Sequence, residues 1–314
     1  MNIVELGGTG IHVSAICFGT LTMGPLQQNL PLLEGAGILE FGFENGINCL
    51  DTAELYQTYP YIKLALKSKP DAVVITKCYA YDAATAKSSF RAAVEGIGRE
   101  YIDVFMLHEQ ESAHTIRGHY EAIEYFLKRR EEGAIGALGL STHHVAGVLG
   151  ANRYPELSVI FPLVNLTGIG IADGNRDDME QATMQAHALG KGVIAMKPFG
   201  GGHLLSRREE AIQYMRGLPY VHTIAVGMQT KAEVLYNVAA FVGKTPPEEA
   251  AAGISLQPRR LMIHDWCEGC GKCALRCKSG ALRLEGGVAV VDNEKCVRCG
   301  YCASACPQFC IKVV

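Results

Sequence analysis

The fold of the C-terminal region follows from a run that reads Cys267-Glu268-Gly269-Cys270-Gly271-Lys272-Cys273-Ala274-Leu275-Arg276-Cys277. Its cysteine spacing recurs in Cys296-Val297-Arg298-Cys299-Gly300-Tyr301-Cys302-Ala303-Ser304-Ala305-Cys306, which Pro307 follows. Two residues separate the first three cysteines of each copy, and three residues precede the fourth. Nine of the chain's twelve cysteines lie between Cys267 and Cys310. Because the sequence has no export signal, such crowding indicates metal binding rather than disulfides.

This is the spacing with which bacterial ferredoxins hold two 4Fe–4S clusters. The first three cysteines of a copy bind one cluster, and the fourth binds the other. We therefore predict two clusters, with the ligand sets Cys267, Cys270, Cys273, Cys306 and Cys296, Cys299, Cys302, Cys277. The alternative is a pair of four-cysteine zinc sites. Cys310 is left over, and we expect it to pack beside a cluster.

The composition excludes several classes of protein. The 314 residues are 48% apolar and 19% charged, which is enough apolar material for a large core, and the net charge of −3 is not that of a nucleic-acid binder. Residues 1–10 do not resemble a signal peptide, and the longest apolar run, 157–172, is too interrupted to span a membrane. We expect a cytoplasmic protein that binds neither nucleic acid nor membrane.

Residues 1–245 alternate short apolar runs with longer amphipathic ones. The eight strand-like runs are Val13–Phe18, Ile47–Leu50, Ala72–Thr76, Asp103–Leu107, Ala137–Leu140, Val159–Val164, Gly192–Met196 and Thr223–Val226. Helical segments lie between them, among them 84–99, 116–132, 178–189 and 231–241. Strand–helix alternation over this length predicts an α/β fold, a TIM (β/α)8 barrel. We expect a linker at 246–258 and a small ferredoxin-like α+β domain at 259–314.

Four side chains stand at or just beyond the carboxyl ends of predicted strands, where barrel enzymes build their active sites. They are Asp51, Tyr56, Lys77 and His108. Lys77 would lower the pKa of Tyr56, Asp51 would orient Lys77, and His108 could donate a hydrogen bond to a substrate oxygen. A lone Asp or His at a strand end is more often a loop hydrogen-bonder than a catalyst, but together the four form a general-acid site for carbonyl reduction.

The barrel sequence resembles the aldo-keto reductases, in the subgroup with a C-terminal ferredoxin domain. The resemblance rests on residues 6–14 (LGGTGIHVS), 46–53 (GINCLDTA), the strand ends 75–77 (ITK) and 107–108 (LH), and 226–227 (VG). It implies that Asp51, Tyr56, Lys77 and His108 are the family's catalytic tetrad, and that the substrate is a small carbonyl compound or alcohol.

The resemblance also implies NADH or NADPH, bound across the barrel mouth. Ser141 and Thr142 would lie near the nicotinamide, and the adenosine end would be held by Gly227, Met228, Glu233 and Asn237. The turn at 200–202 could approach a pyrophosphate, or it could be a glycine-rich turn without a ligand. Four residues depart from the family: Phe161 replaces a glutamine, Met196 an aromatic residue, Glu233 an arginine and Thr142 an asparagine. A carboxylate at position 233 would suit a free ribose hydroxyl, and so favours NADH.

Nicotinamides transfer two electrons as hydride, whereas 4Fe–4S clusters transfer one at a time. A flavin is the usual mediator; the sequence has no flavin signature, although barrels can bind flavin mononucleotide without one. The sequence leaves three readings: a carbonyl reductase whose clusters connect it to a redox protein partner, a reductase with structural clusters, and an electron-transfer protein whose barrel is a docking scaffold.

Overall fold

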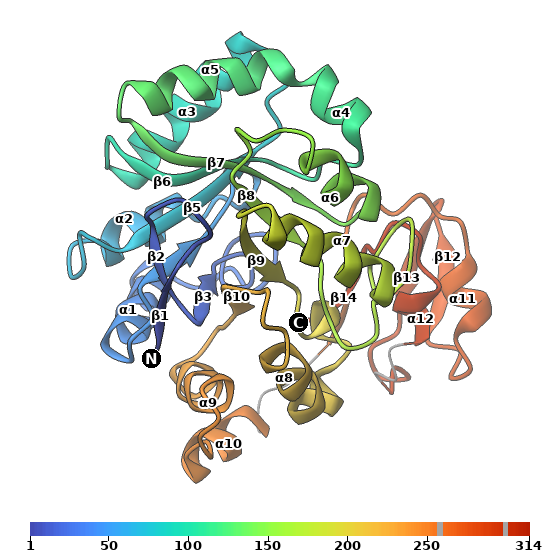
Figure 1. Cartoon of the computed structure of the whole chain (residues 1–314). Coiled ribbons are helices and arrows are strands. Elements are labelled where there is room, and N and C mark those ends of the chain that lie inside the picture. The colour runs from blue at the N-terminus through green and yellow to red at the C-terminus, as the bar shows by residue number, and fades with distance from the viewer. Residues whose placement is uncertain (256–259, 298–300) are drawn as a thin grey trace.

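The computed structural model describes residues 1–255, 260–297 and 301–314. Parallel strands close into a barrel in the order β10-β3-β4-β5-β6-β7-β8-β9 (Figure 1). They are β3 (Ile16–Gly19), β4 (Cys49–Asp51), β5 (Val73–Cys78), β6 (Ile102–Leu107), β7 (Ile135–Thr142), β8 (Val159–Pro162), β9 (Gly192–Met196) and β10 (Thr223–Gly227). The predicted barrel fold is therefore confirmed.

Helices connect the strands and surround the barrel (Figure 1). They are α1 (Leu32–Glu44), α2 (Tyr59–Ala65), α3 (Ala83–Ile97), α4 (Ala113–Gly118), α5 (Tyr120–Glu131), α6 (Val145–Ala151), α7 (Arg176–Ala188), α8 (Arg208–Arg216) and α9 (Lys231–Phe241). Local sequence sets their ends: Asp82 caps α3 by accepting a hydrogen bond from Thr85 N. The segment expected as one helix over 116–132 belongs to two, α4 and α5, which meet at His119.

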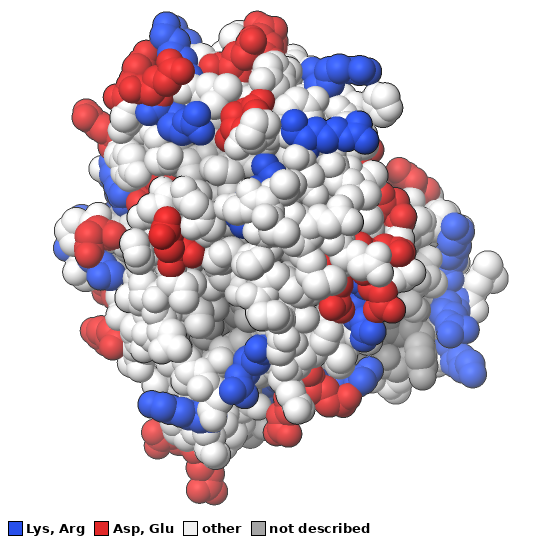
Figure 2. All heavy atoms as spheres, in the orientation of Figure 1, with Lys and Arg blue, Asp and Glu red and all other residues white. Residues whose placement is uncertain are grey.

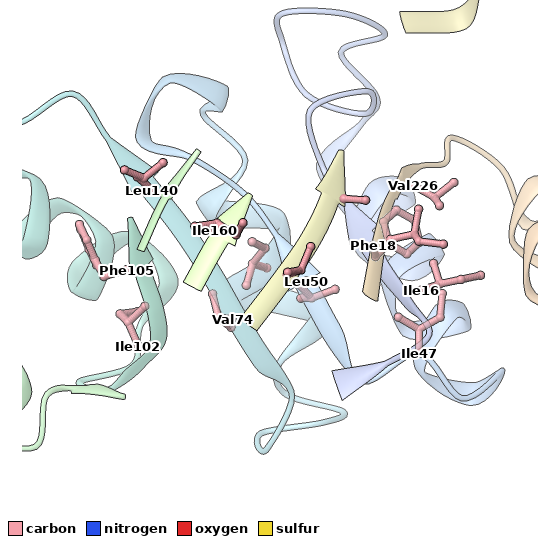
Figure 3. Close-up of a cluster of buried hydrophobic side chains, with 14 of the residues drawn as sticks. Ile16, Phe18, Ile47, Leu50, Val74, Ile102, Phe105, Leu140, Ile160 and Val226 are labelled. Atoms are coloured by element: carbon pink, nitrogen blue, oxygen red, sulfur yellow. The ribbon is translucent and has the colours of Figure 1, made fainter. Parts of the chain in front are cut away.

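The barrel strands bury both of their faces, because helices cover the outside and side chains fill the inside. In β5, Val74 packs in the outer layer between strands and helices, whereas Val73 and Ile75 point into the barrel. Figure 3 shows part of the outer layer, where Phe18 lies beside Ile16 and Val226 and Leu50 lies near Val74. Fully buried strands explain why the runs read as continuously apolar rather than alternating.

A hairpin of β1 (Ile3–Glu5) and β2 (His12–Ser14) precedes the barrel. The prediction of one strand over Val13–Phe18 was wrong, because the chain leaves the hairpin at Ser14 and enters the barrel at Ile16. Val13 and Leu6 are fully buried with the interior side chains. The hairpin therefore covers the end of the barrel at which the strands begin.

Part of the expected linker is a helix. Residues Glu248–Ser255 form α10, which packs on α9 and buries Ala250 and Ile254. The proline and alanine content suggested a boundary, but the apolar residues at 250 and 254 are one helical turn apart and share a face. The expected linker therefore continues the helical layer of the barrel for most of its length.

The C-terminal domain contains two antiparallel strand pairs and two short helices. β11 (Leu261–Ile263) pairs with β14 (Ile311–Val313), and β12 (Leu282–Glu285) pairs with β13 (Val288–Val291). The helices are α11 (Lys272–Arg276) and α12 (Tyr301–Ser304). The domain lies beside the barrel, and its last strand returns to the barrel mouth (Figure 1). There β14 packs against a short 3-10 turn, η2 (Gly200–Gly202).

No helix in the described ranges has the length and apolar character needed to cross a membrane.

Candidate active site

Three neighbouring strands bring the expected catalytic residues to one end of the barrel. Asp51 ends β4, Lys77 lies near the end of β5, and His108 directly follows β6. Lys77 Nζ donates a short hydrogen bond to Asp51 Oδ1 and a second, of 2.7 Å, to Thr52 O. Both members of this ion pair are buried. Lys77 is therefore fixed in place by the strand next to its own.

Tyr56 ends the 3-10 turn η1 (Glu54–Tyr56) that follows β4, and its ring centroid lies 5.0 Å from Lys77 Nζ. The expectation that Lys77 lowers the pKa of Tyr56 was wrong. Burial raises the pKa of Tyr56 well above its ordinary value, and the charges of Asp51 and Glu109 raise it further. Because Lys77 is paired with Asp51, its charge does not offset these effects. Tyr56 is thus a protonated phenol at neutral pH.

His108 is a neutral imidazole. Burial holds its pKa well below the usual value, and the nearby charges of Lys77 and Lys197 lower it further. Its ring stacks on Tyr79 with centroids 4.6 Å apart and meets the Tyr56 ring edge-on at 5.7 Å. Among the described residues, no group hydrogen-bonds to its buried Nδ1 atom. A neutral histidine in this place can donate a hydrogen bond but carries no charge.

A pocket of about 570 Å³ opens above these residues. Its lining joins the tetrad to Phe161 and Met196 and to four of the expected nucleotide contacts: Ser141, Gly227, Glu233 and Asn237. The other two expected contacts lie outside the lining. Thr142 Oγ1 accepts a hydrogen bond from His144 N at 2.9 Å, and Met228 is fully buried.

The far end of the pocket offers groups for a nucleotide. Glu233 Oε2 accepts a hydrogen bond of 2.6 Å from Gln229 N, so the carboxylate is held where β10 leads into α9. Asn237 Oδ1 is buried, and no described residue hydrogen-bonds to it. A buried polar atom without a protein partner is costly unless a ligand satisfies it. The size of the pocket and this amide fit a bound nucleotide.

Strand β14 of the protein fills the space beside the glycine turn η2. A Cβ at Gly202 would lie 2.1 Å from Val313 O, and one at Gly201 would lie 2.8 Å from Lys312 Cδ. His203 Nε2 donates a hydrogen bond of 2.9 Å to Ile311 O. Close approach of β14 therefore explains the glycines, and this favours the turn-without-ligand alternative over a pyrophosphate cradle.

Cysteines predicted for the first cluster lie near one another in pairs, although the described residues contain no group of three or more that is already arranged to hold a metal ion. Gln308 Oε1 lies 4.0 Å from Cys270 Sγ and 3.9 Å from Cys306 Sγ. The Cys267 sulfur accepts a hydrogen bond of 3.4 Å from Ala289 N. Cys306 thus lies with the first copy of the repeat, as the ferredoxin spacing requires. The surplus Cys310 is buried, and its sulfur lies 3.4 Å from that of Cys306. These soft, closely spaced donors fit a 4Fe–4S cluster.

The second set is described in part. Cys277, Cys296 and Cys302 belong to the packed interior of the C-terminal domain. Cys299 lies outside the described residues.

Sequence reasoning missed several residues of the pocket. Glu109 and His143 line it from the ends of β6 and β7, Lys197 from the end of β9, and Phe309 and Lys312 from the C-terminal domain. The first three follow strands of the barrel, which was a usable signal. No local pattern could have placed the last two, because they reach the pocket only through packing of the two domains.

Residues 15–253 match the sequence profile described as the aldo/keto reductase family, and residues 261–307 match that of a 4Fe-4S dicluster domain. Barrel, pocket and cysteine domain together define an oxidoreductase with a ferredoxin-type iron–sulfur domain. The chain belongs to the aldo/keto reductase family.

Relatives of each part are known. L-galactose dehydrogenase of Arabidopsis thaliana is 24% identical over 277 residues, which cover 75% of this chain and 86% of the relative. A component of the Na(+)-translocating ferredoxin:NAD(+) oxidoreductase complex of Acetobacterium woodii is 36% identical over 52% of this chain, but the match spans only 46% of that component. An aldo-keto reductase structure from Bacillus halodurans superimposes with a TM-score of 0.65 at 22% identity, covering 81% of this chain and 95% of that one.

Proposed function

We propose that this protein interconverts a small carbonyl compound and the corresponding alcohol at the bottom of the 570 Å³ pocket. The observation that carries the proposal is the placement of a protonated phenol and a neutral imidazole next to a buried Lys–Asp pair. That arrangement supplies what carbonyl reduction needs at the oxygen atom: a proton, a hydrogen-bond donor and a fixed positive charge.

The roles follow from the protonation states. Tyr56 donates its proton to the carbonyl oxygen as the carbon is reduced. His108 donates a hydrogen bond to the same oxygen, and the Lys77 ammonium stabilises the negative charge that develops there. Asp51 is a positioning residue that holds Lys77. In the oxidation of an alcohol, the tyrosine takes the proton back.

A bound nicotinamide nucleotide would supply the hydride. Ser141 at the pocket floor and Gly227, Glu233 and Asn237 at its far end would hold it. Thr142 and Met228, which the family resemblance also assigned to the nucleotide, contribute no surface to this pocket and are left out of the proposal.

Two 4Fe–4S clusters, bound by the proposed sets Cys267, Cys270, Cys273, Cys306 and Cys296, Cys299, Cys302, Cys277, would let the protein exchange single electrons with a redox protein partner. Figure 2 shows basic side chains along the outer edge of the C-terminal domain. Lys272, Leu275 and Lys278 of this domain are exposed. A basic surface around an apolar residue suits an acidic partner.

The first test is Tyr56→Phe. We expect it to remove most carbonyl-reducing turnover, by roughly 10²-fold or more, because it deletes the proton donor and little else. Nucleotide affinity should stay within about twofold of the wild type, because no proposed nucleotide contact is altered. Steady-state kinetics and calorimetric titration measure the two effects. Full kcat in Tyr56→Phe on a confirmed substrate would refute the assignment.

The second test concerns the choice of nucleotide. Glu233 lines the pocket and would repel a 2′-phosphate, so we expect NADH to bind more tightly than NADPH. Glu233→Gln keeps the length and can still accept from Gln229 N, but removes the charge, so the NADH preference should shrink. Arg208 also lines the pocket, and Arg208→Gln should weaken NADPH more than NADH. Equal titration curves in all three proteins would show that this end does not meet the ribose.

The second candidate is an electron-transfer protein whose barrel serves as a docking scaffold. Packing of β14 onto the glycine turn favours it, as do Phe161 and Met196, which replace common nicotinamide contacts. Absence of binding of either nucleotide to the cluster-loaded protein would support this candidate over the first.

A further inference from the structure

The wall of the pocket opposite the tetrad is built by both domains and contains two lysines. Lys197 follows β9 of the barrel, and Lys312 lies in β14 of the C-terminal domain. Phe309 lies between them: Lys197 Nζ is 5.1 Å from its ring centroid, and Lys312 Nζ also lies over the ring. Because Phe309 follows Cys306 by three residues, this wall belongs to the segment that carries a predicted cluster ligand.

The hydrogen-bond partners of both lysines are neutral. Lys197 Nζ donates to His143 Nε2 at 2.8 Å, and Lys312 Nζ donates a short hydrogen bond to Phe309 O. Among the described residues, neither lysine forms an ion pair with a carboxylate. Glu109, whose charge acts on Lys197, lies 3.9 Å from His143 and accepts a hydrogen bond from Tyr79 OH. The wall therefore presents the positive charge of Lys197, which no ion pair within the described ranges neutralises.

The two lysines differ in what they face. Burial holds the pKa of Lys312 well below its ordinary value and the charge of Lys197 lowers it further, while the Cys306 and Cys310 sulfurs oppose the shift. Lys197 interacts instead with Glu109 and Lys77 inside the pocket. It is also near enough to His108 to influence that residue electrostatically. Of the two cations, Lys197 is the one available to a ligand that lies over the tetrad.

Backbone strain marks the same wall. Among the described residues, five non-glycine residues have positive φ angles, and three of them line the pocket: Glu109 (50°), Lys197 (58°) and Phe309 (47°). Such conformations are unfavourable for residues with a Cβ and cluster at functional sites. At Lys197 the strained backbone directs a long cationic side chain into the pocket.

We propose that the substrate bears a carboxylate, which Lys197, held by its hydrogen bond to His143, binds while Tyr56 and His108 hold the carbonyl oxygen. This inference rests on the proposed function and names its substrate class. Lysine suits the task because its ammonium is a compact charge with three donors, of which His143 takes one. A carboxylate here would neutralise the wall and fix the distance between the anion and the reacting oxygen.

The test uses unreactive ligands of matched shape, so that binding is measured without turnover. Benzoate and benzamide form one pair, and oxamate and oxamide the other; the members of each pair differ chiefly in charge. Anaerobically purified, cluster-loaded protein is titrated by calorimetry, with and without NADH. Trp266, the chain's single tryptophan, stacks on His264 and lines the pocket, so its fluorescence reports occupancy of this site.

We expect the anion of each pair to bind at least about tenfold more tightly than the amide. Lys197→Gln should abolish this preference while amide binding and iron content stay unchanged, and Lys197→Arg should retain it. Equal affinity for anion and amide in both pairs would overturn the proposal, as would an unaltered preference in Lys197→Gln. If carboxylates bind as expected but no carbonyl compound turns over, the proposed function fails while the anion site stands.

Discussion

At the scale of single residues, burial decides what the pocket can do. Residue identities at the strand ends indicated Asp51, Tyr56, Lys77 and His108, and the structure brings these four side chains together. Their protonation states could not be read from the sequence, because they depend on desolvation. The pKa of Tyr56 is raised and that of His108 is lowered, both chiefly by burial. The pocket therefore holds neutral donors around one fixed ion pair.

Carboxylate binding should depend on pH through Lys197. Burial lowers the pKa of Lys197 to about 8, with Lys77 lowering it further and Glu109 opposing the shift. The protonated form binds the anion, so benzoate affinity should be full below this pKa and fall by up to about tenfold per pH unit well above it. Titration calorimetry from pH 6.5 to about 9.5 measures the effect.

Two controls separate Lys197 from the other charged groups that face it, which are its hydrogen-bond partner His143, Glu109, Lys77 and Lys312. Lys197→Arg should bind benzoate with little pH dependence in this range, since arginine stays protonated. Benzamide should bind equally well throughout. A pH profile that survives Lys197→Arg would assign the titration to another group.

At the scale of elements, the contact between β14 and the turn η2 joins the two domains. Gly202 has a φ of 91°, and its missing Cβ leaves room for Val313 O. The glycine is needed twice, for its backbone conformation and for close approach. Substitution of this residue should therefore disturb the interface and not only the turn.

Gly202→Ala should lower the unfolding midpoint more than a matched substitution elsewhere. Gly190 has a similar φ of 79° but open space around the position of a Cβ, so Gly190→Ala costs only the left-handed conformation, about 1 kcal/mol. Gly202→Ala adds overpacking against backbone, about 1–3 kcal/mol more. Urea unfolding under anaerobic conditions compares them. Equal losses of unfolding free energy in the two variants would mean that β14 does not pack closely against the turn.

The sequence predicted correctly those features that depend on residues close together in the chain, and it missed those that depend on contacts between distant residues. Barrel strands such as 192–196 were predicted to the residue, because buried parallel strands are apolar throughout. The run 13–18 looked like one strand, but it belongs to a hairpin strand and a barrel strand. The apolar character of the run does not separate the two strands. The link between His203 and Ile311 joins residues 108 positions apart, and only folding of the whole chain creates it.

At the scale of the whole molecule, the pocket belongs to both domains. The barrel supplies the floor with Tyr56 and Lys77, and the C-terminal domain supplies a wall with Phe309 and Lys312. The ferredoxin-type domain is thus part of the pocket wall. Substitution of its cysteines should therefore alter ligand binding in the pocket. The effect should differ between the two predicted ligand sets, because they lie at different distances along the chain from the wall.

The cysteine sets can be tested with Cys306→Ser and Cys296→Ser. The wild type should contain about eight irons and eight sulfides per chain, and each variant about four, because each loses one ligand set. Only Cys306 lies in the segment that runs directly into Phe309 and β14. Loss of the first cluster should loosen that wall, so Cys306→Ser should weaken benzoate binding and alter Trp266 fluorescence. Cys296→Ser should change the iron content but leave benzoate affinity within about twofold, since Cys296 lies outside the segment that runs from Cys306 into Phe309 and Lys312.

These variants are compared by three measurements: iron and sulfide content, the electron paramagnetic resonance of the reduced protein, and calorimetry with benzoate. Stoichiometric zinc without sulfide in the wild type would contradict the iron–sulfur assignment altogether. Equal weakening of benzoate binding in both variants would mean that the domain responds as one unit. In that case loss of either cluster unfolds its shared interior, where Cys273 and Cys302 pack around Leu261 and Ile311. A selective effect of Cys306→Ser would instead tie the substrate wall to one cluster, through the residues between Cys306 and Lys312 that separate the cluster ligand from the pocket.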